Sequence, residues 1–200
     1  MTNIYQIQSQ RILLRQWQAQ DYPKFAKMCA DPEVMEFFPE LLSEDDSNLL
    51  ADKFASQIAE RGWGFWVAEH IEDGKFLGLV GLGQASDLPI DDAIEVGWRL
   101  AREHWGSGFA TEAALASLCF AFETLALKET IAITAATNVR SQQVMERLGM
   151  KNNNENFQHP RVAEDSSLRE HVLYKVDRQT FLKFTEESHP SFKVEIQSKR

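Results

Sequence analysis

A short glycine-containing turn in the middle of the chain has the composition of an anion-binding loop. Gly106 and Gly108 lie on either side of Ser107, and an alanine-rich helical stretch begins directly afterwards at about Phe109. Glycine has no Cβ, so several main-chain N–H groups can converge on one anion, and the start of a helix adds roughly half a positive charge. The spacing predicts a site for a pyrophosphate whose donors are main-chain groups.

Three kinds of phosphate ligand compete for this turn. A Walker A loop needs a lysine after its last glycine, and Phe109 follows Gly108 here. A dinucleotide fingerprint needs a third glycine, and Thr111 occupies that position. The diphosphate of coenzyme A is the ligand that remains. A tight connection that binds nothing stays open as the structural interpretation.

The wider sequence resembles the GNAT superfamily of acetyltransferases, especially its ribosomal-protein N-acetyltransferase-like branch. The resemblance covers roughly Arg11 to Val176 and rests on EVGWRL, HWGSGFATEA, ITAATNVRSQQVMERLGM, FQHPRV and LREHVLYKV. Glu103 departs from the Gln or Arg that many members place ahead of the glycines, which puts a side-chain contact to phosphate in doubt. The resemblance implies an α/β (α+β), three-layer fold whose mixed, mostly antiparallel central sheet is flanked by helices and splayed between 93–100 and 130–136.

The resemblance also implies that the pantetheine arm of acetyl-CoA lies in that splayed gap. Main-chain groups of β-compatible residues would line the arm, the turn would hold the diphosphate, and an asparagine would touch the arm while capping a helix. The residues implied to bind the cofactor are Trp98, Arg99, Leu100, Trp105, Gly106, Ser107, Gly108, Phe109, Ala110, Thr111, Asn138 and Ser141.

Glu95 and Ser141 are the candidates for catalysis, because attack on a thioester needs a neutral amine and a thiolate that can leave. Period-two alternation along 94–100 places Glu95, Gly97 and Arg99 on one face. A carboxylate partly desolvated there would have a raised pKa and would accept the ammonium proton. The alternative interpretation is that Glu95 only pairs with an arginine or faces solvent. Ser141 lies where relatives carry a hydroxyl near the cofactor sulfur, and it serves equally well as a helix cap.

The sequence defines the residues of the acceptor pocket less sharply than it defines the glycine turn. The resemblance places the aromatic walls of an acceptor pocket at Trp17, Phe37, Phe38 and Trp66. As a further alternative, His171 or Tyr174 of the late strand would reach the acceptor amine. Core packing is the competing interpretation for each aromatic residue. His159 and His171 are twelve residues apart with no further ligand pattern, so no metal site is expected.

The elements that must position these residues follow from periodicity and capping signals. Strands are expected at 11–17, 63–69, 75–84, 93–100, 130–136 and 171–176, with a polar loop from Ser86 to Asp92. Helices are expected from Asp21 to Cys29, from a cap at Ser43 to about Glu60 before Gly62, at 109–125, and from Asn138 to Leu148. The last fifteen or so residues are expected to fray.

Composition limits the class of protein. The 200 residues carry a formal charge of −9, which disfavours nucleic acid, and no apolar stretch reaches the ~18 residues that a membrane span needs. Two isolated cysteines fit a cytoplasmic protein. We expect one domain over 1–200, with a core at about 11–177 and a C-terminal extension at 178–200.

Together these features predict an acyl-CoA-dependent N-acyltransferase that moves acetyl from acetyl-CoA to a primary amine by direct attack in a ternary complex. The acceptor is expected to be a small-molecule or peptide amine. A non-catalytic acyl-CoA-binding or sensing module is the alternative, and a homodimer is left open. A nucleotide-binding oxidoreductase is disfavoured by the missing third glycine.

Overall fold

The computed structural model describes residues 2–86, 88–90 and 93–199. The predicted loop from Ser86 to Asp92 therefore lies partly outside the described residues. Within them the chain forms a mixed α/β fold in which one open sheet has helices on both faces. The predicted fold class is confirmed.

The N-terminal part of the chain opens with two strands and two helices. The bounds are β1 Ile4–Gln8, β2 Ile12–Arg15, the 3₁₀ turn η1 Ala19–Asp21, α1 Tyr22–Cys29 and α2 Glu44–Arg61. Ser43 caps α2, because its Oγ accepts a hydrogen bond from the N–H of Asp46. Gly62 ends the helix in the left-handed conformation, with φ of 89°. Both predicted caps are confirmed, whereas β1 is a strand that the sequence analysis did not expect.

An antiparallel meander follows and leads to the glycine turn. It consists of β3 Phe65–His70, β4 Phe76–Gln84 and β5 Ile94–Leu100, and a 3₁₀ turn, η2 Arg102–His104, comes next. The β4–β5 register runs without interruption from Gly78↔Leu100 to Gln84↔Ile94. Because that pairing is continuous, one edge of β5 is fully engaged by β4 and only its other edge can meet a ligand.

Two helix-and-strand units form the middle of the chain. The bounds are α3 Phe109–Cys119, a π-helical continuation η3 Phe120–Thr124, β6 Glu129–Ala135 and α4 Val139–Arg147. Asn138 caps α4 by accepting a hydrogen bond from the N–H of Ser141 at 3.2 Å. The sequence predicted this cap and the helix that follows it.

The C-terminal part completes both ends of the sheet. Its elements are β7 Lys151–Asn152, β8 Phe157–Gln158, β9 Glu170–Asp177, α5 Arg178–Ser188 and β10 Glu195–Lys199. β10 pairs with β1 from Ile4↔Lys199 to Gln8↔Glu195. The expected fraying of the last residues is therefore wrong, because β1 and β10 satisfy each other's main-chain hydrogen bonds.

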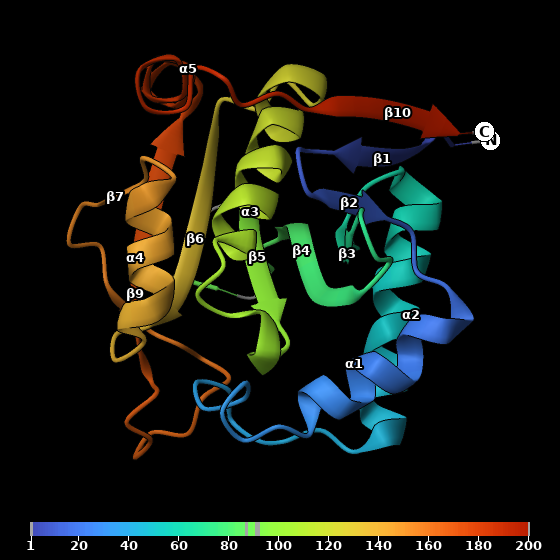
Figure 1. The fold of residues 1–200 in the computed structure, drawn as a ribbon. Coiled ribbons are helices and arrows are strands. Elements are labelled where there is room, and N and C mark those ends of the chain that lie inside the picture. The colour runs from blue at the N-terminus through green and yellow to red at the C-terminus, as the bar shows by residue number, and fades with distance from the viewer. Residues whose placement is uncertain (1, 87, 91–92, 200) are drawn as a thin grey trace.

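The sheet runs in the order β10-β1-β2-β3-β4-β5-β6-β9-β7, and β8 also pairs with β9. Figure 1 shows β1 and β10 together at one end and β6 and β9 towards the other. Phe65 and Trp66 are consecutive residues of β3, so their side chains point to opposite faces. Phe65 packs on Phe54 of α2, and Trp66 packs on Phe120 at the end of α3. The α2 helix and the end of α3 therefore cover opposite faces of the sheet.

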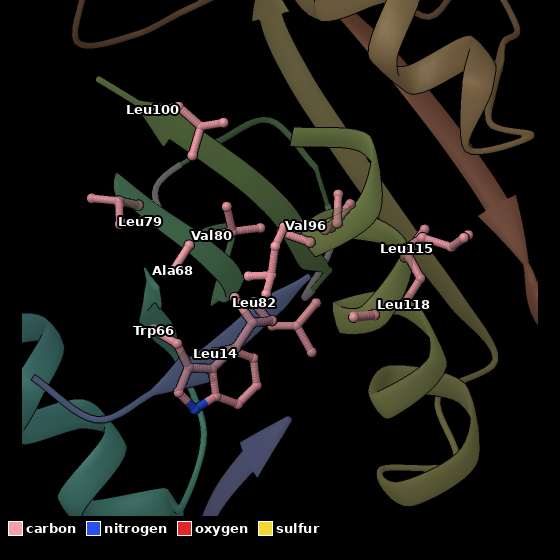
Figure 2. Close-up of a cluster of buried hydrophobic side chains, with 14 of the residues drawn as sticks. Leu14, Trp66, Ala68, Leu79, Val80, Leu82, Val96, Leu100, Leu115 and Leu118 are labelled. Atoms are coloured by element: carbon pink, nitrogen blue, oxygen red, sulfur yellow. The ribbon is translucent and has the colours of Figure 1, made fainter. Parts of the chain in front are cut away.

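The main core lies between the sheet and α3. Figure 2 shows Val80, Leu82 and Val96 from β4 and β5 near Leu115 and Leu118 of α3. These five side chains are at most 1% exposed. Their burial fixes the start of α3 relative to β5, and so fixes where the glycine turn must lie.

Candidate active site

The glycine turn is exposed and has the conformation that only glycine adopts easily. Gly106 and Gly108 have φ of 77° and 79°, and both are exposed together with Ser107. A Cβ built on Gly106 would meet no atom within 4 Å, so open space lies directly over the main chain. Gly108 is the N-cap of α3, whose first N–H groups have no helical partner. The turn therefore fits the diphosphate of an acyl carrier.

A salt bridge from the β1–β2 turn braces this loop. The carboxylate of Glu112 accepts hydrogen bonds from Arg11 Nε at 2.6 Å, Arg11 N at 2.8 Å and Ser9 Oγ at 2.8 Å. Arg11 Nη1 also donates to the carbonyl of Ser107 at 3.1 Å, and its guanidinium lies 4.6 Å from the ring centre of Phe109. The sequence pattern did not predict this contact, because about a hundred residues separate Arg11 from Glu112.

Trp105 and Arg140 connect the turn to neighbouring elements. Trp105 donates its indole N–H to the carbonyl of Leu100 at 2.9 Å, which ties the turn to the end of β5. Arg140 of α4 lies 4.8 Å from the Trp105 ring and 5.5 Å from the Phe37 ring, and it forms an ion pair with Glu36. Arg140 thus joins α4 to the segment between α1 and α2.

The strands β5 and β6 diverge beside the turn. They are the parallel pair of the sheet, and within the described residues their register is limited to Glu95↔Ile131. Figure 1 shows β5 and β6 lying farther apart towards the C-terminal end of β5. The edge of β5 beyond Glu95, which includes Trp98, Arg99 and Leu100, therefore presents main-chain N–H and C=O groups that β6 does not pair. An extended ligand can pair with such an edge as another strand would.

Glu95 occupies the point where β5 and β6 are still joined. Burial raises the pKa of Glu95 to about 7, and the positive charge of Arg161 acts in the opposite direction. A carboxyl group with this pKa exchanges its proton near neutral pH, which a general base needs. The sequence analysis expected this direction of shift on the same physical ground.

Asn138 and Ser141 form a small polar network at the end of β6. The side chain of Asn138 donates to Thr134 Oγ1 at 2.9 Å and to Ser141 Oγ at 3.1 Å. Since Ser141 Oγ accepts in this network, its own proton is directed elsewhere. The structure thus keeps Ser141 Oγ available as a donor while holding it in place.

Four of the six expected acceptor residues come from the first half of the chain, and they fall into a partly exposed pair and a buried pair. Phe37 and Phe38 are partly exposed and lie in the segment between α1 and α2. Trp17 is 7% exposed, donates its indole N–H to the carbonyl of Phe65 and packs on Phe25. Trp66 has no exposed surface, lies in the cluster of Figure 2 and donates to the carbonyl of Tyr5. Trp66 lies in β3 and Trp17 in the segment that follows β2, and both rings are packed in the core, not in an exposed pocket.

His171 and Tyr174 lie on opposite faces of β9, because they are three positions apart and side chains alternate between faces along a strand. Tyr174 is 6% exposed within the main core, and burial raises its pKa. The ring of His171 lies 4.6 Å from that of His159, and burial lowers the pKa of both, that of His159 to about 4. The structure therefore pairs His171 with His159, beyond reach of Tyr174.

Two further features of the described residues bear on the earlier expectations. No group of three or more His, Cys, Asp or Glu side chains is arranged to hold a metal ion. No described helix combines the length and the apolar character needed to cross a membrane.

Comparison with known proteins places this architecture in a family. The sequence model described as "Acetyltransferase (GNAT) domain" matches residues 11–151. The Bacillus subtilis protein YkkB is 32% identical over 143 residues, which are 70% of this chain and 81% of YkkB. The Aspergillus fumigatus FsC-acetyl coenzyme A-N(2)-transacetylase is 28% identical over 171 residues, covering 81% of this chain and 72% of that protein.

Solved structures share the fold at lower sequence identity. A GNAT-family acetyltransferase from Bacillus anthracis has a TM-score of 0.73 at 21% identity, over 87% of this chain and 99% of its own. A Vibrio cholerae protein described as a ribosomal-protein-serine acetyltransferase has a TM-score of 0.70 at 17% identity, over 88% of this chain and 99% of its own. With the match of the family model over residues 11–151, the chain belongs to the GNAT family of acetyltransferases and is an acyltransferase enzyme.

Proposed function

We propose that the protein transfers the acetyl group of acetyl-CoA to a primary amine by direct attack in a ternary complex. The observation that carries the proposal is the divergence of β5 from β6 between two features. The exposed glycine turn lies beyond one end of β5, and Glu95 lies at the other, where the strands still pair. An acyl carrier bound along β5, with its diphosphate on the turn, would bring its acyl end towards Glu95.

The residues of the chain have separable roles in this reaction. Bound acetyl-CoA supplies a thioester whose carbonyl carbon the amine attacks. Glu95 takes the proton that the ammonium group must lose, directly or through water. A main-chain N–H of β5 donates to the carbonyl oxygen as the C–N bond forms and the C–S bond breaks. The hydroxyl of Ser141 donates a hydrogen bond to the departing thiolate.

Direct attack is supported by the state of the two cysteines, which would otherwise be candidates for a covalent acyl intermediate. Cys29 and Cys119 are both free and buried. Burial raises the pKa of Cys119 to about 12, which leaves it protonated at neutral pH. The same pair also supports a reducing compartment, and we propose that the enzyme works in the cytoplasm.

The name of the Aspergillus relative joins acetyl-coenzyme A with transfer to nitrogen, which supports the same donor and bond type for this chain. We propose a small-molecule or peptide amine as the acceptor. The segment containing Phe37 and Phe38, with Glu95 opposite, would form its pocket.

The experiment incubates the protein with acetyl-CoA and a broad amine panel and follows release of free thiol. Acceptor-dependent release is expected. Calorimetry with coenzyme A runs in parallel, and binding without acceptor-dependent release would select the non-catalytic acyl-CoA-binding module instead. Absence of both would contradict the proposed site as a whole.

A further inference from the structure

Arg99 is a partly buried cation, and no acidic side chain among the described residues forms an ion pair with it. Its guanidinium lies 4.0 Å from the ring centre of Phe38, and Nη1 donates to Cys29 Sγ at 3.2 Å. The Nε atom is buried and has no hydrogen-bond partner among the described residues. Burial lowers the pKa of Arg99, and its contact with Cys29 offsets this only in part. The side chain retains some exposure, so a ligand can reach it.

Arg15 shows how this protein compensates a buried guanidinium elsewhere. It is 6% exposed and donates to both oxygens of Asp21, at 2.7 and 2.9 Å, and to Glu69 at 2.7 and 2.8 Å. A buried charge is costly unless it is paired and hydrogen-bonded. The chain holds 30 acidic residues, yet among the described residues none forms an ion pair with Arg99.

Arg61 is a second arginine with a buried nitrogen that lacks a partner, and it provides a useful contrast. Its Nε donates to the carbonyl of Trp63 at 3.0 Å. It also lies in the last turn of α2, where the helix dipole favours a cation. Arg99 has no such carbonyl acceptor among the described residues: it donates to the Cys29 sulfur, a weak acceptor, and its strand has no comparable dipole.

The guanidinium of Arg99 lies beside the proposed acceptor pocket. Arg99 and Glu95 lie on the same face of β5, four residues and about 13 Å apart along the strand. That face lies towards Cys29 of α1 and towards Phe38, beside the proposed acceptor pocket. The main-chain donors of the glycine turn are built from different residues, so Arg99 is not needed to explain how a diphosphate binds.

We infer that Arg99 binds an oxyanion of the acceptor, so that the enzyme acetylates amines that also carry a carboxylate several bonds from the nitrogen. The inference rests on the proposed function and names the substrate class of that same site. A planar guanidinium fork matches a carboxylate in two parallel hydrogen bonds, and Phe38 holds the fork in one plane. The acceptor carboxylate would supply the counter-charge that no described residue supplies to Arg99.

The test uses acceptors in matched pairs, each amine with a free carboxylate against its carboxamide. Amino acids, dipeptides and ω-amino acids of increasing length make up the pairs, and kcat/KM is measured for each with acetyl-CoA. We expect the best carboxylate to exceed its amide by about 10- to 100-fold, the range of one charge-assisted contact. In Arg99→Gln this ratio should fall to near one, and Arg99→Lys should recover part of it.

A control variant and a binding measurement make each result decisive. Arg61→Gln also removes a partly buried arginine and should leave the ratio as in the wild type. Calorimetric titration of the same pairs into the protein saturated with coenzyme A reports discrimination without turnover. If the pairs discriminate in binding but none reacts, the proposed function fails and the anion site stands.

Three results would overturn the inference. The first is an equal or higher kcat/KM for the amides with acceptor-dependent turnover intact. The second is failure of every carboxylate to bind. The third is a loss of coenzyme A affinity in Arg99→Gln that equals the loss of turnover, which would assign Arg99 to a cofactor phosphate. Thermal unfolding checks the fold, and Arg99→Gln should melt at or above the wild-type temperature because it removes an uncompensated charge.

Discussion

The proposed site has two halves, a cofactor half and an acceptor half, which are built from different parts of the polypeptide. The cofactor half is the turn at 105–111 with the open edge of β5, and its donors are main-chain groups. The acceptor half consists of side chains, Glu95 and Arg99 of β5 with Phe38 from the α1–α2 segment. A main-chain site needs only glycines and a helix start, so it works in a chain of net charge −9. A side-chain site depends on charges that the fold brings together and partly desolvates.

Because the two halves use different groups, each should control a different measured quantity. Changes in the cofactor half should alter the affinity for coenzyme A, because its groups contact a part of the ligand that does not react. Changes in the acceptor half should alter turnover or acceptor choice at nearly constant cofactor affinity. A variant in either half that changed coenzyme A affinity and turnover together would contradict this separation of roles.

Glu95→Gln should give the largest effect, in the acceptor half. Loss of a general base typically lowers kcat by about 10²- to 10⁴-fold, and coenzyme A affinity should change little. Wild-type kcat/KM should rise with pH through about 7, as Glu95 loses its proton, and the variant should lack this limb. The positive charge of Arg161 lowers the pKa of Glu95, so Arg161→Gln should move the limb to higher pH. An unaltered pH profile in Glu95→Gln would remove Glu95 from the mechanism.

The raised pKa of Glu95 also has a definite sign for stability. The folded state holds a proton between the ordinary value of 4.5 and about 7, where the unfolded state has lost it. The free energy of unfolding should therefore fall as pH rises through that window. Melting temperatures at pH 5 and pH 8 should show that Glu95→Gln stabilises the protein more at pH 8 than at pH 5.

Gly106→Val should give the next largest effect, in the cofactor half. A valine is strained at φ of 77°, and its side chain fills the open space over the turn where the diphosphate would lie. Loss of two charge-assisted contacts, each worth about 10-fold or more, predicts at least about a 100-fold weaker Kd for coenzyme A by calorimetry. Gly74→Val is the matched control, because Gly74 also has a positive φ of 66° and open space around it but lies in the β3–β4 turn. Equal affinity of a folded Gly106→Val variant would exclude the assigned turn.

Local signals in the sequence predicted most of the helices and strands and the glycine turn of the proposed cofactor half. Ser43, Gly62 and Asn138 act through neighbours within four residues, so their caps could be inferred without tertiary structure. The β1–β10 pairing could not, because it joins the two ends of the chain. The resemblance placed Trp66 in the pocket with core packing as the competing interpretation, and alternation alone cannot decide which face of β3 meets the core.

The acceptor half shows the same limit more strongly. The sequence placed Glu95 and Arg99 on one face of β5, but nothing local to Arg99 indicates that Cys29 and Phe38 meet it or that no carboxylate does. The brace between Arg11 and Glu112 was hidden for the same reason. Both contacts arise from tertiary packing between segments that are distant in sequence.

Glu112→Gln should have a smaller effect than Gly106→Val, because it loosens the turn without blocking it. The carboxylate accepts three hydrogen bonds and is 10% exposed, so its replacement should cost about 1–3 kcal/mol of unfolding free energy. We expect coenzyme A affinity to fall by about 3- to 10-fold as Ser107 loses its anchor through Arg11. Glu33→Gln removes an exposed partner of Arg102 and should change neither quantity measurably. A stability loss with unchanged affinity would show that the turn holds its shape alone.

Ser141→Ala should give the smallest effect, although its hydroxyl lies in the network that caps α4. A thiolate leaves without full protonation, so loss of one neutral hydrogen bond predicts a decrease in kcat of about 2- to 10-fold. Asn138→Ala removes the helix cap as well and should cost about 1 kcal/mol of stability, which Ser141→Ala should not. Stopped-flow measurement of thiol release separates this step from product release. A decrease in kcat of about 10³-fold in Ser141→Ala would contradict this and would make Ser141 an obligatory acid. The rate-limiting step would then be proton transfer to the sulfur, not proton removal from the amine nitrogen.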